Sequence, residues 1–274
     1  MEIKILVDNN TIIDEYYLGE PAVSYLIIEK GTKILFDVGY SDIFISNAGK
    51  MKESLKDLDY VVLSHGHNDH TGGLEPLVNH LKGSEEGAKT KLVAHEDTFL
   101  YKEEMGESIG SFVKEEFVKN HFDTVFTTKP LWLTENLVFL GEIERSHTFE
   151  NKNPIGKYKL NDDLVDDYLK DDSALAYKSP EGLVIITGCS HAGICNIIDY
   201  AKKVCREERI VDVLGGFHML EPTREELEGT MQFFKEAHIN RAHPCHCTSL
   251  DSKIHLSQVT SVEEVGVGQV LKYL

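Results

Sequence analysis

Three histidines and one aspartate fall within six consecutive positions, as His65, His67, Asp69 and His70. Imidazole nitrogens together with a carboxylate oxygen are the usual protein ligands of zinc, iron and manganese. His65 and His67 can both be directed at one point because Gly66 between them leaves the backbone free to turn. Asp69 and His70 can turn toward a second point nearby. The segment therefore predicts a metal site, in which two ions roughly 3.5–4 Å apart could share one hydroxide.

Regular elements are predicted on both sides of this segment. A short apolar run at Asp59–Ser64 reads as a buried strand that ends at the first histidine. After the pair Gly72-Gly73, apolar residues recur at three- and four-residue spacing over residues 74–81, which predicts a helix with one buried face. A strand end followed by a loop and a helix is therefore expected to hold the histidines.

Further ligands must come from later in the chain, because two histidines or one aspartate and one histidine do not fill a metal's coordination shell. Three later histidines, His191, His218 and His246, each follow a short strand-like run, and a loop at a strand end can reach a shared site. The other candidates are His95, His121, His147 and His243.

The order of predicted elements indicates an α/β layered protein. The first third alternates β-branched runs with turns, and Lys30-Gly31-Thr32 between two such runs predicts a hairpin. Later strands alternate with helices predicted at Ile194–Cys205 and Glu225–Ala237. A purely parallel doubly wound sheet is the alternative, and the early hairpin disfavours it.

The middle of the chain is less regular. Thr98–Met105 and Ser111–Asn120 look helical, and the acidic run Asn161–Asp172 is interpreted as a solvated loop or a short surface helix. No linker rich in proline, glycine or serine divides the sequence. We therefore expect one domain over residues 1–274, with a partly helical insertion around 97–172.

Composition restricts the partners. The chain has 28 Lys and Arg against 46 Asp and Glu, a formal net charge of −18 over 274 residues, which disfavours extended contact with nucleic acid. No apolar run is long enough to cross a membrane, and the first ten residues do not resemble a signal peptide. The five cysteines form no CxxC pair and no even disulfide set, so the expected location is the reducing cytoplasm.

The pattern HxHxDH at residues 65–70 resembles the defining motif of the metallo-β-lactamase superfamily. Asp37, in FDVG at 36–39, resembles the aspartate at an earlier strand end in that superfamily. The resemblance implies a four-layer αββα sandwich with two sheets inside and a metal centre at one edge. Asp37 would then orient the metal-binding loop.

Three later stretches, GCSHAGI at 188–194, GGFH at 215–218 and HCT at 246–248, resemble one branch of this superfamily. That branch comprises metal-dependent hydrolases related to the dihydropterin–ribofuranosylaminobenzene phosphate synthase of methanopterin biosynthesis. The resemblance runs from about residue 3 to the C-terminus. It implies two divalent metal ions, zinc first and manganese or iron as alternatives, with the ligands His65, His67, Asp69, His70, His191 and His246.

One position departs from the superfamily pattern. Most members place a metal-bridging aspartate after a strand that ends in glycine, whereas here Gly188 is followed by Cys189. We expect His191 to replace the bridge as a terminal ligand, with a Cys189 thiolate as the alternative. His147 is an alternative third histidine ligand.

The resemblance implies hydrolysis, or phosphate-linked group transfer, of a small anionic substrate such as a pterin phosphate or another phosphoester. Asp69 would bind metal and hold the nucleophile's proton, and His218 would serve as an acid or base at the pocket. Arg145 and Arg241 are candidate anion clamps. A di-iron redox protein and a non-catalytic metal-binding protein are the alternative functions, and a homo-oligomer is left open.

Overall fold

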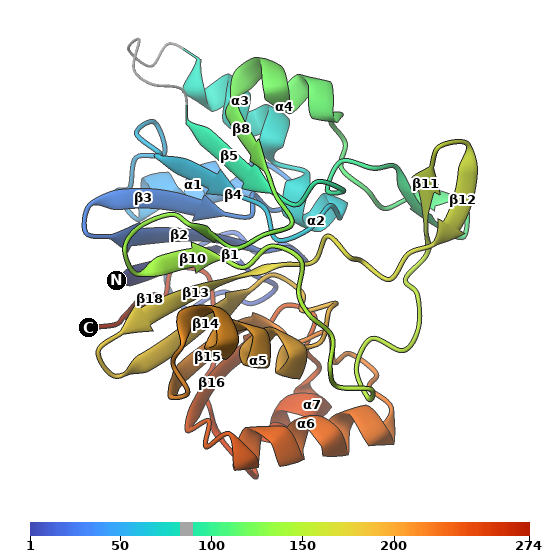
Figure 1. The fold of residues 1–274 in the computed structure, drawn as a ribbon. Coiled ribbons are helices and arrows are strands. Elements are labelled where there is room, and N and C mark those ends of the chain that lie inside the picture. Colours follow the sequence, from blue (N-terminus) through green and yellow to red (C-terminus); the bar gives the residue numbers. More distant parts are fainter. Residues whose placement is uncertain (83–89) are drawn as a thin grey trace.

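Two seven-stranded sheets pack face to face, and helices cover the outer face of each (Figure 1). The computed structural model describes residues 1–82 and 90–274. The strands of the first sheet are, in spatial order, β18 (Val270–Lys272), β1 (Glu2–Val7), β2 (Ser24–Glu29), β3 (Thr32–Phe36), β4 (Tyr60–Val62), β5 (Lys91–Ala94) and β8 (Asp123–Phe126). Those of the second are β17 (Ser261–Val262), β16 (Arg241–Cys245), β15 (Ile210–Gly216), β14 (Gly182–Thr187), β13 (Ala174–Ser179), β10 (Leu137–Phe139) and β9 (Leu131–Trp132).

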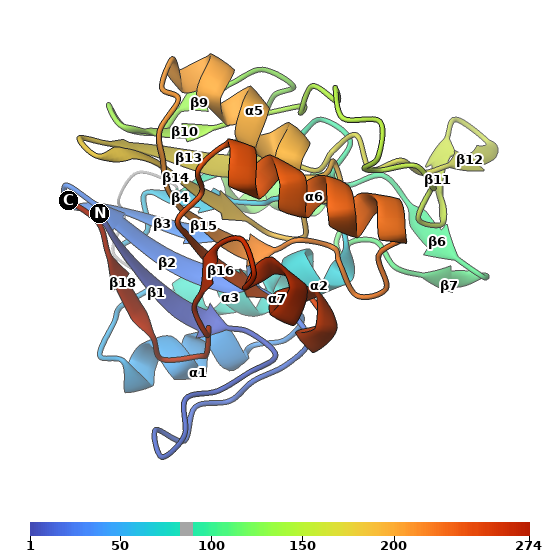
Figure 2. The same cartoon turned by 90° about the horizontal axis from the view of Figure 1, so that it is seen from below.

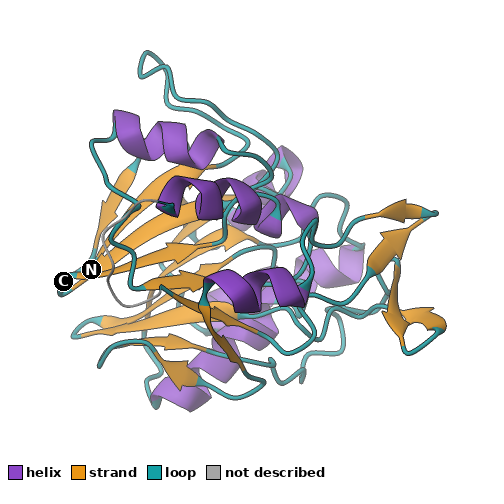
Figure 3. Cartoon of the chain, turned by 90° about the horizontal axis from the view of Figure 1, so that it is seen from above, coloured by secondary structure: helices purple, strands orange, loops and turns teal. Residues whose placement is uncertain are grey.

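The helices are divided between the two outer layers (Figure 1), and Figure 3 shows them from above, in purple against the orange strands. Three pack on the first sheet: α1 (Ile43–Lys50), α3 (Leu74–Leu81) and α4 (Glu115–His121). Three pack on the second: α5 (Ile194–Cys205), α6 (Arg224–Glu236) and α7 (Leu250–Leu256). A separate apolar cluster fills the space between the sheets. The expected four-layer αββα sandwich is therefore confirmed.

The sheets are mixed in the same way, which excludes the purely parallel alternative. In each sheet, three neighbouring strand pairs at one side are antiparallel and the three at the other side are parallel. The predicted hairpin joins β2 to β3, and Glu29 pairs with Thr32. Lys30 and Gly31 both have positive φ, 48° and 89°, as the two central residues of a type I′ turn require.

Residues 97–172 consist of short strands, the helix α4 and irregular connections. Two of their strands, β9 and β10, belong to the second sheet, and β8 belongs to the first. The remaining four form a small sheet that projects from the sandwich, seen at the right of Figures 1 and 2, with strands β12 (Asp163–Asp166), β11 (Lys157–Leu160), β6 (Lys102–Glu104) and β7 (Glu107–Ser108). The interpretation of residues 1–274 as one domain stays a prediction.

Two predictions for this region are wrong. The segment Thr98–Met105 contains strand β6 rather than a helix, because its backbone pairs with two other strands of the small sheet. The side chain of Lys102 on this strand is buried in ion pairs with distant aspartates. The acidic run Asn161–Asp172 is not a solvated loop or helix throughout. Its first part forms β12, and Asp167, Asp171 and Asp172 after it are buried. The helix predicted at Ser111–Asn120 is present as the shorter α4.

Candidate metal centre

The predicted ligands meet where strands of both sheets end. His65 follows β4, Cys189 and His191 follow β14, and His246 follows β16. The carboxyl ends of parallel neighbouring strands lie at the same edge of a sheet, which brings these loops together. The short helix α2 (Asn68–Thr71) carries Asp69 and His70 into the same space.

All six predicted ligands contribute atoms to one cluster. The Nε2 atoms of His65 and His191 are 3.2 Å apart, although their positions differ by 126 in the sequence. The Asp69 Oδ2 atom lies 3.5 Å from His70 Nε2 and 3.2 Å from His246 Nε2. The His67 ring centroid lies 4.6 Å from that of His65.

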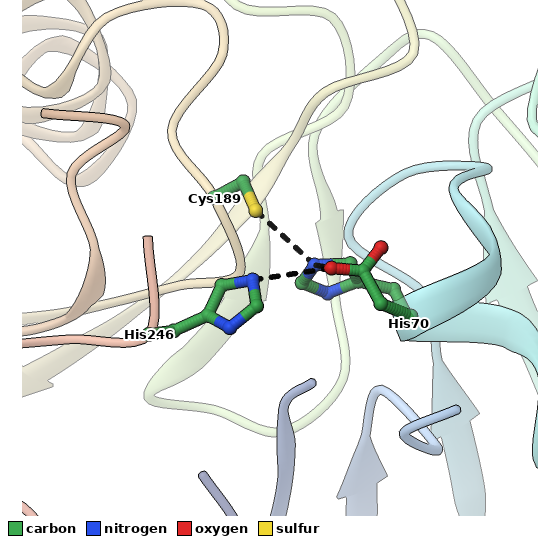
Figure 4. Close-up of side chains that lie close together, drawn as sticks. His70, Cys189 and His246 are labelled. Carbon is green, nitrogen blue, oxygen red and sulfur yellow. Dashed lines mark hydrogen bonds and ion pairs between the residues drawn. The ribbon is translucent and has the colours of Figure 1, made fainter. Parts of the chain in front are cut away.

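Cys189 also belongs to this cluster. Its sulfur is 3.2 Å from His70 Nε2, and Figure 4 shows Cys189 and His246 approaching His70 from the same side. Potential ligand atoms within 4.8 Å of one another form three groups: His65, His67 and Asp69; His65, Cys189 and His191; and Asp69, His70, Cys189 and His246. Cys189 is common to two of them. The sequence left open the choice between His191 and Cys189, and the structure brings both to the site.

The electrostatics suit a cation. Burial, and then the charges of neighbouring histidines, lowers the pKa of His65 and of His191 well below the ordinary value. Burial likewise lowers the pKa of His67 to about 4. These imidazoles are therefore neutral near pH 7 and have lone pairs available. The buried His67 Nε2 and His191 Nδ1 atoms have no hydrogen-bond partner among the described residues.

Asp69 and His70 each lie beside groups of opposite charge. Burial of Asp69 favours its neutral form, but His70 and His246 outweigh burial and lower its pKa. Burial of His70 is outweighed by Asp69 and Asp37, which raise its pKa. Burial and the neighbouring Cys247 raise the pKa of the Cys189 thiol, so a bound metal would have to displace that proton.

Asp37 contacts the loop that carries the candidate ligands. One carboxylate oxygen accepts the Ser64 amide at 2.7 Å. The other accepts the Ser64 hydroxyl and lies 2.7 Å from His70 Nδ1. Such a carboxylate–histidine contact selects the tautomer whose Nε2 lone pair faces a metal. A side chain on Gly188 would clash, because its Cβ would lie 2.2 Å from the Ser64 hydroxyl oxygen.

The loop that carries His246 has its own support. The Asp8 carboxylate accepts the His246 amide at 3.2 Å, and Asn9 Oδ1 lies 3.2 Å from His246 Nδ1. Asp8 and Asn9 were not among the predicted site residues. A polar pair directly after the first strand was the signal for this contact, but its target could not be read from the sequence.

The remaining histidines have other partners. His147 Nε2 lies 2.8 Å from Asp199 Oδ2, so the structure does not bring this alternative ligand to the cluster. His243 bonds to Asp212, and His121 bonds to the Phe117 carbonyl. His95 Nδ1 accepts the Asp97 amide. None of these four belongs to a group of potential ligands within the described residues.

Two adjoining cavities, of about 450 and 380 Å³, lie beside the cluster. Ile155, His191, His218 and Leu220 line both. The His218 ring centroid is 4.3 Å from that of His191. A bond to the Cys247 sulfur outweighs burial and raises the pKa of His218. His218 is thus placed between the ligand cluster and space that a small molecule could occupy.

The two candidate anion clamps do not line these cavities. Arg145 donates to the Leu169 carbonyl at 2.7 Å. Arg241 is the first residue of β16, at the opposite end of that strand from His246, and it donates to Asp212. The larger cavity instead contains Lys152, which pairs with Glu225 at 2.6 Å.

Comparison with known proteins agrees with this architecture. The family model of the metallo-beta-lactamase superfamily matches residues 18–200. An uncharacterized protein of Methanocaldococcus jannaschii is 30% identical over 98% of this chain and 99% of its own length. The same organism's 7,8-dihydropterin-6-methyl-4-(beta-D-ribofuranosyl)-aminobenzene-5'-phosphate synthase is 28% identical, over 88% of this chain and 84% of its own.

A solved structure extends the likeness to three dimensions. It is a metal-dependent hydrolase of the beta-lactamase superfamily, with 27% identity, a TM-score of 0.84, and coverage of 100% of this chain and 99% of that one. The family-model match, the HxHxDH loop and the sandwich with its ligand cluster lead to one conclusion. The chain belongs to the metallo-beta-lactamase superfamily.

Proposed function

We propose that this chain is a binuclear metal-dependent hydrolase, or a phosphate-linked transferase, that acts on a small anionic molecule. The observation that carries the proposal is the convergence of the ligand side chains from three separate segments, 65–70, 189–191 and the loop of His246. His65, His67 and His191 would hold one ion. Asp69, His70 and His246 would hold the other, with the Cys189 sulfur between the two sets. Thiolate and imidazole ligands favour zinc, with manganese or iron as alternatives.

The metals would supply positive charge and a water that is acidic near neutral pH. Asp69, whose low pKa keeps it ionised, would orient the nucleophile and accept a hydrogen bond from it. His218, at the boundary of the two cavities, would carry the proton that the leaving group needs. The neutral imidazoles of His65, His67 and His191 would contribute their lone pairs without first losing protons at pH 7.

The substrate we propose is a phosphoester, with a pterin phosphate as the specific candidate. The named synthase of Methanocaldococcus jannaschii supports this choice. A net charge of −18 favours a small anion attracted by local metal charge over nucleic acid or an anionic membrane surface. None of the helices in residues 1–82 and 90–274 combines the length and apolar character of a bilayer span. All five cysteines are unpaired and buried, which supports our proposal of a reducing, cytoplasmic location.

The test combines metal analysis with a substrate panel. The protein purified with zinc is expected to contain two ions and to hydrolyse a generic phosphodiester. Incubation with a dihydropterin pyrophosphate should release pyrophosphate if the pterin assignment holds. His67→Ala should lose metal and at least about 100-fold of the turnover, because it removes a ligand. His80→Ala, on α3, is the control and should change neither.

The outcomes separate the candidate functions. Turnover by metal-free protein would contradict the proposal. Two bound ions without turnover of any phosphoester, lactone or thioester would favour a non-catalytic metal-binding protein. A di-iron redox function would instead be indicated by iron that cycles between oxidation states when dioxygen is added.

A further inference from the structure

Two adjacent carboxylates between β12 and β13 reach the loops that carry the histidines. Asp171 Oδ2 accepts the Gly66 amide at 2.8 Å, and Gly66 lies between His65 and His67. Asp172 Oδ2 accepts the Ala192 amide at 2.8 Å, directly after His191. Both carboxylates are buried, with exposures of 1% and 0%. One stretch of chain therefore contacts the first histidine loop and the later one.

A buried lysine supports Asp171. Lys102 Nζ lies 2.9 Å from Asp171 Oδ1 and 2.7 Å from Asp167 Oδ2. Lys102 is only 2% exposed and is on β6 of the projecting sheet. A carboxylate is tolerated away from water when an opposite charge and hydrogen-bond donors surround it. The Lys102 pair explains how Asp171 can be buried and still present an oxygen to Gly66.

The second carboxylate is less completely satisfied. Asp172 Oδ1 has no hydrogen-bond partner among the described residues, and it lies 4.0 Å from His65 Nδ1. The next residue, Ser173, donates its amide to the Ser64 carbonyl at 2.9 Å. Backbone and side-chain contacts therefore both align this stretch with the residues around His65.

We propose that Asp171 and Asp172 are positioning residues that hold His65, His67 and His191 in register for one of the two metal ions. The inference rests on the proposed function, since it assumes that these histidines bind metal. Loops that are already held in place lose less conformational freedom when the ion binds. His70 is held separately by Asp37, and His246 by Asp8 and Asn9. Loss of Asp171 or Asp172 should therefore weaken the binding of only one of the two ions.

The first measurement needs no metal. Amide hydrogen exchange of the metal-free protein should show roughly 5- to 10-fold faster exchange at Gly66 in Asp171→Ala, because a hydrogen bond is lost there. Asp172→Ala should increase the exchange rate of the Ala192 amide by a similar factor. Asp163→Asn removes one charge from the exposed β12 strand of the same segment and is the matched control. It should leave both amides unchanged.

The second measurement is metal affinity by chelator competition. Asp171→Ala and Asp172→Ala should each weaken one of the two ions at least about 10-fold, as loss of a supporting contact does elsewhere. Asp172→Asn keeps an acceptor oxygen and should recover most of the affinity that Asp172→Ala loses. In a His67→Ala background, which already lacks the same ion, Asp171→Ala should weaken the remaining ion no further.

Several results would overturn the inference. One is that the alanine variants bind both ions with wild-type affinity. Another is that they weaken the binding of both ions equally. A third is that Asp172→Asn recovers none of the affinity that Asp172→Ala loses. If Asp171→Ala does not fold, Asp172→Ala and Asp172→Asn apply the same criteria. A wild-type protein that binds no metal would contradict the proposed function, whereas unchanged amide exchange in both alanine variants would contradict the positioning role.

Discussion

Four residues around the candidate metal centre have left-handed backbone conformations that non-glycine residues seldom adopt. Asp37, Ser190, His218 and His246 have φ values of 55°, 60°, 52° and 48°. Such a conformation costs about 1 kcal/mol or more per residue, so surrounding contacts must maintain it. Asp37 and His246 both have such contacts, to Ser64 and His70 and to Asp8 and Asn9 respectively. Contacts within the site therefore maintain the left-handed conformations of these two residues.

Cys189→Ser tests the sulfur ligand. The hydroxyl is a much poorer donor than a thiolate, so we expect zinc affinity at one position to fall at least about 10-fold. The cobalt-substituted protein should also lose its thiolate-to-cobalt charge-transfer absorption. Cys205→Ser, at the buried end of α5, should retain the wild-type spectrum. A Cys189→Ser protein with an unchanged cobalt spectrum would show that the sulfur is not a ligand.

At the scale of elements, α5 connects the loop of His191 to the outer helical layer. Its first amides are capped by Glu150, a residue distant in sequence, whose two oxygens accept the amides of Cys195 and Asn196 at 2.9 and 3.0 Å. A carboxylate at this end satisfies otherwise unpaired amides and interacts favourably with the helix dipole. Gly193, with φ of 99°, allows the close approach of Glu150.

Glu150→Ala should therefore lower the free energy of unfolding by about 1–2 kcal/mol, the range for loss of a helix cap. Glu150→Gln keeps one acceptor oxygen and should lie between alanine and wild type. Chemical denaturation of the metal-free proteins measures the difference. The control is Glu144→Ala, which removes only an exposed pair with Lys203 and should change stability little. Equal stability of Glu150→Ala and wild type would refute the capping role.

At the scale of the molecule, the two sheets each present strand ends to one shared edge. The first sheet supplies His65 and the α2 residues, and the second supplies Cys189, His191 and His246. An ion bound between them would link the two halves of the sandwich. Because the unfolded chain lacks this arrangement, a bound metal would add to the stability of the folded state.

Zinc addition should therefore raise the thermal midpoint. At a free concentration 100 times the Kd, one ion contributes about 2.7 kcal/mol, which corresponds to roughly 5–10 °C for a chain of this size. Calorimetry with and without zinc measures the shift, and magnesium at the same concentration should have a smaller effect. The same increase in His67→Ala and wild type would show that zinc acts elsewhere.

Local sequence determined much of this protein. The apolar runs and their turns predicted the strands that lead to His65, His191 and His246. A buried strand and the point where it ends can be predicted from the pattern of apolar and turn residues within a few positions. The HxHxDH spacing likewise placed four chemically suitable side chains on one loop. The two-residue hairpin followed from backbone preferences alone.

Only tertiary structure decided which distant groups met these loops. Cys189 and His191 are almost adjacent in sequence, and both reach the ligand cluster, whereas His147 bonds to Asp199 outside it. Asp171 and Asp172 belong to a run whose composition favours solvent, and they are buried because Lys102 and two backbone amides meet them there. These contacts depend on how separate strands pack and on which buried groups become paired, and residue spacing along the chain carries no record of either.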